Sequence, residues 1–149
     1  DDVHFVITGG GPLKDEIRRQ IERSNLTGRV TMTGVVPDID ALYRHVEILV
    51  VPSYMETTSR VTIEALLWGV PVVASDVGGL PMLIQSGTDG FLCPIGDIAV
   101  FAHRIEHLLT HPEERARMGT KGRAKARERF SVATMRGQVE AVYDEILAG

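Results

Sequence analysis

Short apolar segments alternate with longer segments of helical periodicity along the whole chain. The apolar segments are rich in valine, isoleucine and leucine and are followed by turn-forming residues, which is typical of strands. The sequence predicts strands over residues 3–8, 29–33, 46–51, 71–75 and 90–93, the first of them buried. The expected helices begin near residues 13, 38, 59, 80, 97, 112 and 131.

Several of the expected helices carry their own end signals. Asp38, Asp97 and Ser131 stand where a helix begins, and their side-chain oxygens are expected to accept a backbone N–H of the first turn. Gly69 is expected to end the helix that starts near residue 59. The last helix carries four apolar residues on one face, namely Met135, Val139, Val142 and Ile146.

The order of the expected elements indicates the fold class. Strands and helices alternate with short connections, which favours an α/β fold: a Rossmann-like, doubly wound, mostly parallel sheet with helices on both faces. The 149 residues are enough for one domain with its own core. Because the chain starts without methionine and is strand-like from Val3, we expect residues 1–149 to belong to a longer protein, with the start of the domain truncated.

Composition and charge narrow the class of protein further. The chain is 44% hydrophobic but only 5% aromatic, so aliphatic side chains must build the core. No apolar run approaches the roughly 20 residues of a membrane span, and nothing near Asp1 and Asp2 resembles a signal peptide. Cys93 is the single cysteine, so a reduced, cytoplasmic setting is expected. A net charge of −4 argues against a general nucleic-acid binder.

Four loops are expected at the same edge of the sheet. They cover residues 9–12, 34–37, 52–59 and 76–79, and each follows the carboxyl end of a strand. In open α/β sheets ligands bind beyond this edge, which favours one shared site. The alternative is ordinary turn chemistry, because glycine is common in strand-to-helix turns.

Glu56 and Glu64 are the most informative pair of residues in the chain. They stand eight positions apart, between an apolar strand and an apolar helix. Carboxylates in such surroundings are costly unless something hydrogen-bonds them, and a hydroxyl-rich ligand such as a sugar or a ribose would do so. A glycosidase also uses two carboxylates, but one loop-and-helix segment rarely holds both across a scissile bond. Two unrelated structural carboxylates are the remaining alternative, with Glu64 favoured by the helix dipole.

The start of the helix near residue 59 is a candidate anion site. Backbone N–H groups of Thr58, Ser59, Arg60 and Val61 are unpaired at such a position, and the helix dipole favours negative charge there. The side chain of Arg60 adds positive charge, unless it pairs with one of the two glutamates.

The glycine loop at residues 9–12 is a weaker candidate. Gly10 and Gly11 would let the backbone approach a phosphate at a helix start. The loop lacks a full G-x-G-x-x-G, and no acidic residue follows at the distance that a nicotinamide dinucleotide requires. A tight strand-to-helix turn explains these glycines equally well.

Several segments together resemble a known family. They are residues 52–56, 64–66, 69–75 and 78–79, flanked by 9–13, 30–34, 87–92 and the closing 130–143. These segments resemble the signature of the family 4 retaining glycosyltransferases, which have the GT-B fold. The resemblance covers essentially the whole chain, and its most specific part is Glu56-x7-Glu64 followed by Gly-x-Pro-Val-Val-Ala-Ser.

The resemblance implies that this chain is the C-terminal, donor-binding domain of such an enzyme. These enzymes move a sugar from a nucleotide diphosphate sugar to an acceptor, with retention at the anomeric carbon. The resemblance implies that Glu56 is the catalytic residue and binds the hydroxyls of the donor sugar. It implies that Glu64 binds the ribose hydroxyls. It implies that the backbone amides near Ser59, Arg60 and Val61 bind the diphosphate or the sugar. It also implies that the loop at Gly34, Val35 and Val36 lines the nucleobase. It implies no metal and no cofactor, because the nucleotide sugar is a substrate.

The chain departs from the family pattern in two places. Thr57 stands where the family often has glycine, and Met82 stands where it commonly has glutamate. The family's basic arginine and lysine, and its N-terminal acceptor-binding domain, are expected outside this chain, so the isolated fragment is expected to be inactive or nearly so. A catalytically silent nucleotide-sugar module, another GT-B enzyme such as an epimerase or phosphorylase, and a nicotinamide-dependent dehydrogenase domain remain alternatives.

Two other features allow a function but favour a structural explanation. Five basic residues between Lys121 and Arg129 allow a peripheral contact with an anionic membrane that carries an acceptor. The segment lacks an apolar face with Trp or Phe, so a solvated helix is the better interpretation. His103 and His107 are one helical turn apart, but no third metal ligand is evident.

Overall fold

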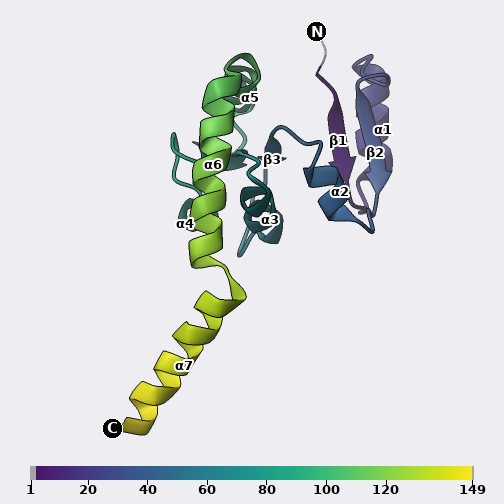
Figure 1. Ribbon diagram of the computed structural model, residues 1–149. Coiled ribbons are helices and arrows are strands. Elements are labelled where there is room, and N and C mark those ends of the chain that lie inside the picture. Colours follow the sequence, from purple (N-terminus) through teal and green to yellow (C-terminus); the bar gives the residue numbers. More distant parts are fainter. Residues whose placement is uncertain (1–2, 149) are drawn as a thin grey trace. The chain divides into compact units, whose positions relative to one another are not determined.

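The structure of the chain, a computed structural model, describes residues 3–148 (Figure 1). Asp1, Asp2 and Gly149 lie outside the described residues, and so do the outer bounds of the predicted domain, 1–149. The elements in chain order are β1 (Phe5–Thr8), α1 (Lys14–Arg23), β2 (Val30–Gly34), α2 (Ile39–Tyr43), β3 (Leu49–Val51), α3 (Arg60–Trp68), β4 (Val72–Ser75), α4 (Leu80–Leu83), β5 (Gly90–Cys93), α5 (Ile98–Thr110), α6 (Pro112–Arg129) and α7 (Val132–Ala148).

All the strand ladders are parallel, so the predicted α/β class with helices flanking parallel strands is confirmed. The ladders form two sheets, β1–β2 and β3–β4–β5, where the sequence pattern suggested one. The chain divides correspondingly into two compact units, residues 1–42 and 43–149.

The first unit consists mainly of β1, α1 and β2. Phe5 pairs with Val30, and the backbone N–H of Gly9 donates to the carbonyl of Gly34 at 2.7 Å, just beyond the ladder. The prediction that the first strand is buried is wrong, since all four residues of β1 are exposed, with Phe5 at 46%. The physical reason is size, because a two-stranded sheet with one helix offers little surface to cover its strands.

The second unit has a well-packed core around its central strand, β4. Every residue of β4 is buried, as expected for a strand covered on both faces. One side of the sheet packs against α5 and α6 in a cluster of six buried residues: Val73, Phe91, Cys93, Phe101, Leu108 and Met118. Val72 and Ala74 alternate to the opposite face and are fully buried as well.

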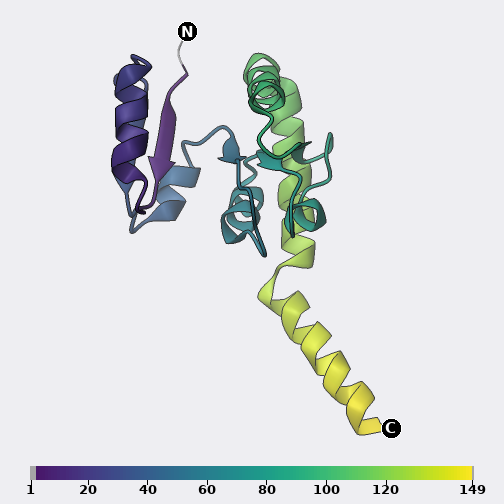
Figure 2. The same ribbon diagram turned by 180° about the vertical axis from the view of Figure 1, so that it is seen from behind.

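Helices α3 and α6 lie side by side in both views (Figures 1 and 2). Glycines allow this close approach, because a Cβ added to Gly119 would lie 2.0 Å from the carbonyl oxygen of Gly69. Gly69 itself ends α3 in the left-handed conformation, with φ of 77°, as predicted.

The predicted helix caps are also confirmed. The side chain of Asp97 accepts a hydrogen bond from the N–H of Val100 at 3.0 Å. Asp38 accepts from the N–H of Ala41 at 3.1 Å, and Ser131 accepts from the N–H of Thr134 at 3.1 Å. Each cap satisfies an N–H that the first turn of a helix leaves unpaired.

The final helix, α7, has no buried residue. Its predicted apolar face is present but uncovered: Met135, Val139, Val142 and Ile146 are between 50% and 69% exposed. Within residues 3–148, no helix combines the length and the apolar character needed to cross a membrane.

Candidate donor site

The loop of residues 52–59 carries Glu56 from the end of β3 to the start of α3. Val51, the last residue of β3, is buried, and α3 begins at Arg60, which places Glu64 on its second turn. Because β3 and β4 are parallel neighbours, the loops after them reach the same edge of the sheet. The N–H of Gly79, in the loop after β4, donates to the carbonyl of Glu56 at 3.3 Å, so the structure brings these two predicted loops together.

Two partners hold the carboxylate of Glu64. The hydroxyl of Tyr43 lies 3.4 Å from Oε2 of Glu64 and 3.1 Å from the carbonyl oxygen of Val61, and it can donate to either. Nε of Arg60 lies 3.2 Å from Oε1 of Glu64. The Arg60 side chain is 88% exposed, so this ion pair contributes at most about 1 kcal/mol. Arg60 thus pairs with Glu64, as one of the predicted alternatives held, and Glu64 is half-buried with one contact on each carboxylate oxygen.

Tyr43 is the residue of this site that the sequence analysis missed. It ends α2 and is buried, and a buried tyrosine hydroxyl normally finds a hydrogen-bond partner. This preference could have predicted that Tyr43 has a hydrogen-bond partner. It could not have identified Glu64, which lies 21 positions away along the chain, as that partner.

The amino end of α3, the predicted anion site, has no side-chain cap. Ser59 is its N-cap, but its side chain accepts no N–H of the first turn. The buried Ser59 hydroxyl instead accepts a hydrogen bond from the hydroxyl of Thr62 at 2.9 Å. The first N–H groups of α3 therefore have no side-chain cap, and this is the part of a helix that binds phosphates. Thr58 and Val61 beside it are exposed.

Glu56 differs from Glu64 in how it is held. Its side chain is half-buried, and among residues 3–148 its carboxylate has no hydrogen-bond or ion-pair partner. Its backbone is instead packed against Gly78, and its carbonyl accepts the N–H of Gly79. Both lone-pair-bearing oxygens of Glu56 are therefore available to hydroxyl groups of a ligand.

The other predicted site residues belong to the first unit. Gly34 has a φ of 69° and Gly9 a φ of 98°, which explains glycine at both positions. Gly10 and Gly11 adopt no such conformation, and a Cβ on either would meet open space. Val35 is 81% exposed. Val36 is half-buried, as are residues 32 and 34 of β2.

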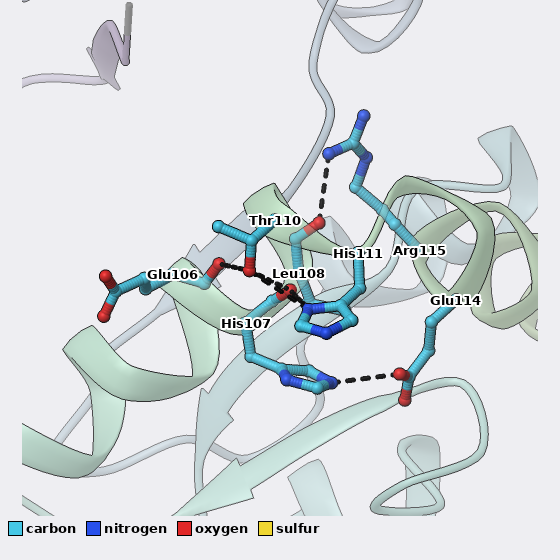
Figure 3. Close-up of polar contacts among 7 residues, drawn as sticks. All are labelled: Glu106, His107, Leu108, Thr110, His111, Glu114 and Arg115. Carbon is cyan, nitrogen blue, oxygen red and sulfur yellow. Dashed lines mark hydrogen bonds and ion pairs between the residues drawn. The ribbon is translucent and has the colours of Figure 1, made fainter. Parts of the chain in front are cut away.

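One histidine of α5, His107, contacts α6 (Figure 3). Nε2 of His107 lies 3.0 Å from Oε2 of Glu114, and its ring stacks on that of His111 at 4.2 Å. His103 takes no part in the cluster that Figure 3 shows. No group of three side chains suited to a metal ion occurs among the described residues.

Cys93 has the properties of a core residue. It is fully buried, and this burial raises the pKa of its thiol. The positive charge of Arg104 lowers the pKa by a smaller amount, and the negative charge of Asp97 raises it slightly further. A raised pKa keeps the thiol protonated near neutral pH and therefore poorly nucleophilic.

Comparison with known proteins gives a consistent result. Residues 1–125 match the family described as Glycosyl transferases group 1. The Alpha-D-kanosaminyltransferase of Streptomyces kanamyceticus is 33% identical over 147 residues, which are 97% of this chain and 38% of that protein. The N-acetyl-alpha-D-glucosaminyl L-malate synthase of Bacillus anthracis is 29% identical over 146 residues, 98% of this chain and 38% of that protein. The chain thus spans well under half the length of these relatives.

Solved structures share the fold along nearly the whole chain. HepE from Anabaena, in complex with UDP, superposes with a TM-score of 0.90 and 30% identity over 96% of this chain and 41% of that one. Sucrose-phosphate synthase from Thermosynechococcus elongatus gives a TM-score of 0.85 and 30% identity over 96% of this chain and 38% of that one. Two further structures of HepE contain UDP-glucose, or UDP together with glucose.

Proposed function

Because the chain belongs to the group 1 glycosyl transferases, we propose that it is the donor-binding C-terminal domain of a retaining glycosyltransferase. The full-length enzyme would move a sugar from a nucleotide diphosphate sugar to an acceptor. One observation carries the proposal: the Glu64 carboxylate, contacted by Tyr43 and Arg60, lies on the second turn of a helix whose first N–H groups have no side-chain cap, and the unpartnered carboxylate of Glu56 lies in the preceding loop. This arrangement offers amide donors for a phosphate next to carboxylate acceptors for hydroxyls.

The proposed roles follow from the chemistry of each group. The amides at Ser59, Arg60 and Val61 and the dipole of α3 stabilise the negative charge of the diphosphate, including the charge that develops when it leaves. Thr58 lies at the entry to this helix start. The carboxylate of Glu64 accepts hydrogen bonds from the two ribose hydroxyls, with Tyr43 and Arg60 fixing its position.

Glu56 is proposed to act on the sugar. Its carboxylate accepts hydrogen bonds from sugar hydroxyls and stabilises the positive charge that develops at the anomeric carbon as the bond to the diphosphate breaks. The absence of a partner for this carboxylate among residues 3–148 supports the assignment, because a ligand would meet an acceptor that is not already engaged.

For the first unit the roles rest on the family resemblance. We assign Gly34, Val35 and Val36 to the nucleobase and Gly10 and Gly11 to the approach of a phosphate. The open space beside Gly10 and Gly11 is compatible with such an approach. The UDP and UDP-glucose bound to HepE support a nucleotide-sugar donor and make uridine the first base to test.

The proposal includes a partner within the same protein. We expect an N-terminal domain that binds the acceptor and supplies the basic residues which neutralise the leaving diphosphate, so that no resident metal or cofactor is needed. The exposed apolar face of α7 supports a further domain, because such a face is normally covered.

The protein is proposed to be cytoplasmic. A membrane-surface acceptor is the less favoured possibility, since two cations of the basic segment are engaged within the chain. Nζ of Lys125 donates to the carbonyl of Leu83, and Arg129 donates to the carbonyl of Met82. Fewer charges are therefore free to meet anionic lipids.

The test is calorimetric binding to the full-length protein. UDP, GDP, ADP and NAD are compared on the wild type, on Glu64→Ala and on the control Glu106→Ala, which removes an exposed glutamate of α5. The proposal expects one nucleoside diphosphate to bind, the Glu64→Ala variant to lose that binding at least tenfold, and the control to retain it. Binding of NAD alone, or equal binding by both variants, would refute it.

A further inference from the structure

The turn after β4 fits unusually closely against the loop that carries Glu56. A Cβ on Gly78 would lie 1.7 Å from the carbonyl oxygen of Glu56, and a Cβ on Gly79 would lie 2.0 Å from that of Thr57. Both obstacles are backbone atoms, which cannot rotate away as the end of a side chain can. Gly78 also has a φ of 56°. Only glycine at both positions allows the two loops to touch in this way.

The glycine turn is itself firmly anchored in the second unit. The N–H of Asp76 donates to the carbonyl of Cys93 at 2.7 Å, so the turn starts from the β4–β5 ladder. The N–H of Leu80 donates to the carbonyl of Val77 at 3.1 Å, and the Leu80 side chain is fully buried. The turn is therefore held by the core, whereas residues 52–59 contain no helix or strand.

The two glutamates thus depend on different supports. Glu64 lies within α3 and is held by Tyr43 and Arg60. Glu56 has no side-chain partner in the described part of the chain, and its backbone contacts the glycine turn. We propose that Gly78 and Gly79 are positioning residues for Glu56: they fix its carboxylate where it recognises the sugar and leave recognition of the nucleotide to Glu64. This inference rests on the proposed function and adds a separate determinant for the sugar half of the donor.

The experiment separates the two halves of the donor. The dissociation constants of UDP and UDP-glucose, or of the matching pair for the base found in the screen above, are measured with full-length protein. The variant is Gly79→Ala. The control is Gly137→Ala in α7, where an added Cβ meets nothing within 4 Å. The kcat of sugar transfer is measured in parallel, with a cell extract from the organism that makes the protein as the source of the acceptor.

The expected result is a split between the two ligands. Gly79→Ala binds UDP with a dissociation constant within about twofold of that of the wild type. Its preference for UDP-glucose, expressed as the ratio of the dissociation constants of UDP and UDP-glucose, falls to about one. Its kcat falls about a hundredfold, which is the size of effect that a 1 Å misplacement can have. Gly137→Ala matches the wild type. In a Glu56→Ala background, Gly79→Ala has no further effect on the preference, because the carboxylate that it displaces is gone.

Other outcomes overturn the inference in distinguishable ways. If Gly79→Ala keeps the wild-type preference for UDP-glucose over UDP, the turn does not act through Glu56. The same conclusion follows if the variant loses affinity for UDP and UDP-glucose to the same extent. If Gly79→Ala does not fold, Leu80→Val loosens the anchor of the turn and keeps both glycines. It should lower the preference by about threefold with UDP binding retained, and no change would refute the idea. A wild type that binds no nucleotide overturns the proposed function first, and this inference with it.

Discussion

The contact between Asp89 and Lys125 provides a test of how the second unit is held together. Asp89 precedes β5 and is 1% exposed. Its carboxylate accepts the N–H of Gln85 at 2.8 Å and pairs with Nζ of Lys125 from α6. The same ammonium donates to the carbonyl of Leu83 at 2.6 Å. One lysine therefore ties α6 to both α4 and the start of β5.

The expected cost of Lys125→Met follows from these contacts. Removing one partner of a buried ion pair costs about 3–5 kcal/mol, because the other charge stays buried without compensation. The Lys125 side chain is 20% exposed, which places the loss at the lower end of that range. The carbonyl of Leu83 loses a donor as well, worth about 1 kcal/mol. We therefore expect the second unit to lose about 3–4 kcal/mol.

Native-state hydrogen exchange measures this loss in the full-length protein. Amides of β4 and β5 report the free energy of opening of the core, and the expected loss accelerates their exchange by roughly 100- to 1000-fold. Lys121→Met is the matched control, because Lys121 is an exposed lysine one turn earlier on α6; its effect should stay within about 0.5 kcal/mol. If the two variants exchange alike, the ion pair does not support the core and the reasoning fails.

Three further predictions concern packing, the thiol and the fragment. Gly119→Ala should destabilise the second unit by about 1–3 kcal/mol, because its Cβ would meet the carbonyl oxygen of Gly69 at 2.0 Å. The measurement is the melting temperature, with Gly137→Ala as the control, and a melting temperature of Gly119→Ala that is lowered no more than that of the control would contradict this prediction. The raised pKa and burial of Cys93 predict that alkylation, followed at pH 7–8 by mass spectrometry of its peptide, is at least tenfold slower in native than in unfolded protein, and equal rates would disprove it. Residues 1–149 alone should show no sugar transfer from UDP-glucose under conditions where the full-length enzyme turns over.

The local elements were largely predictable, because local forces decide them. The strand predicted at residues 90–93 is found with those bounds, and Asp97 and Ser131 cap their helices as expected. Each feature depends on residues within a few positions along the chain: a periodic pattern, or a side-chain oxygen within reach of an N–H. Membership of the group 1 glycosyl transferases, suggested by the Glu56-x7-Glu64 segment, is also confirmed.

Burial was less predictable, because it depends on what lies against an element. The apolar sequence of β1 indicated a buried strand, yet its residues are exposed in a two-stranded sheet. The apolar face of α7 was predicted from its spacing, but the spacing does not say what covers it, and the described residues leave it exposed.

The sequence by itself thus determined the element types, the parallel α/β class, the helix caps and the two glutamates, since all of these are written in short-range spacing. Only the tertiary structure decided how those glutamates are held. The hydroxyl of Tyr43 reaches Glu64 across 21 positions, and the glycines after β4 meet the backbone of Glu56 from a neighbouring strand. Such contacts form only when the sheet brings distant segments together, and no periodicity along the chain encodes them.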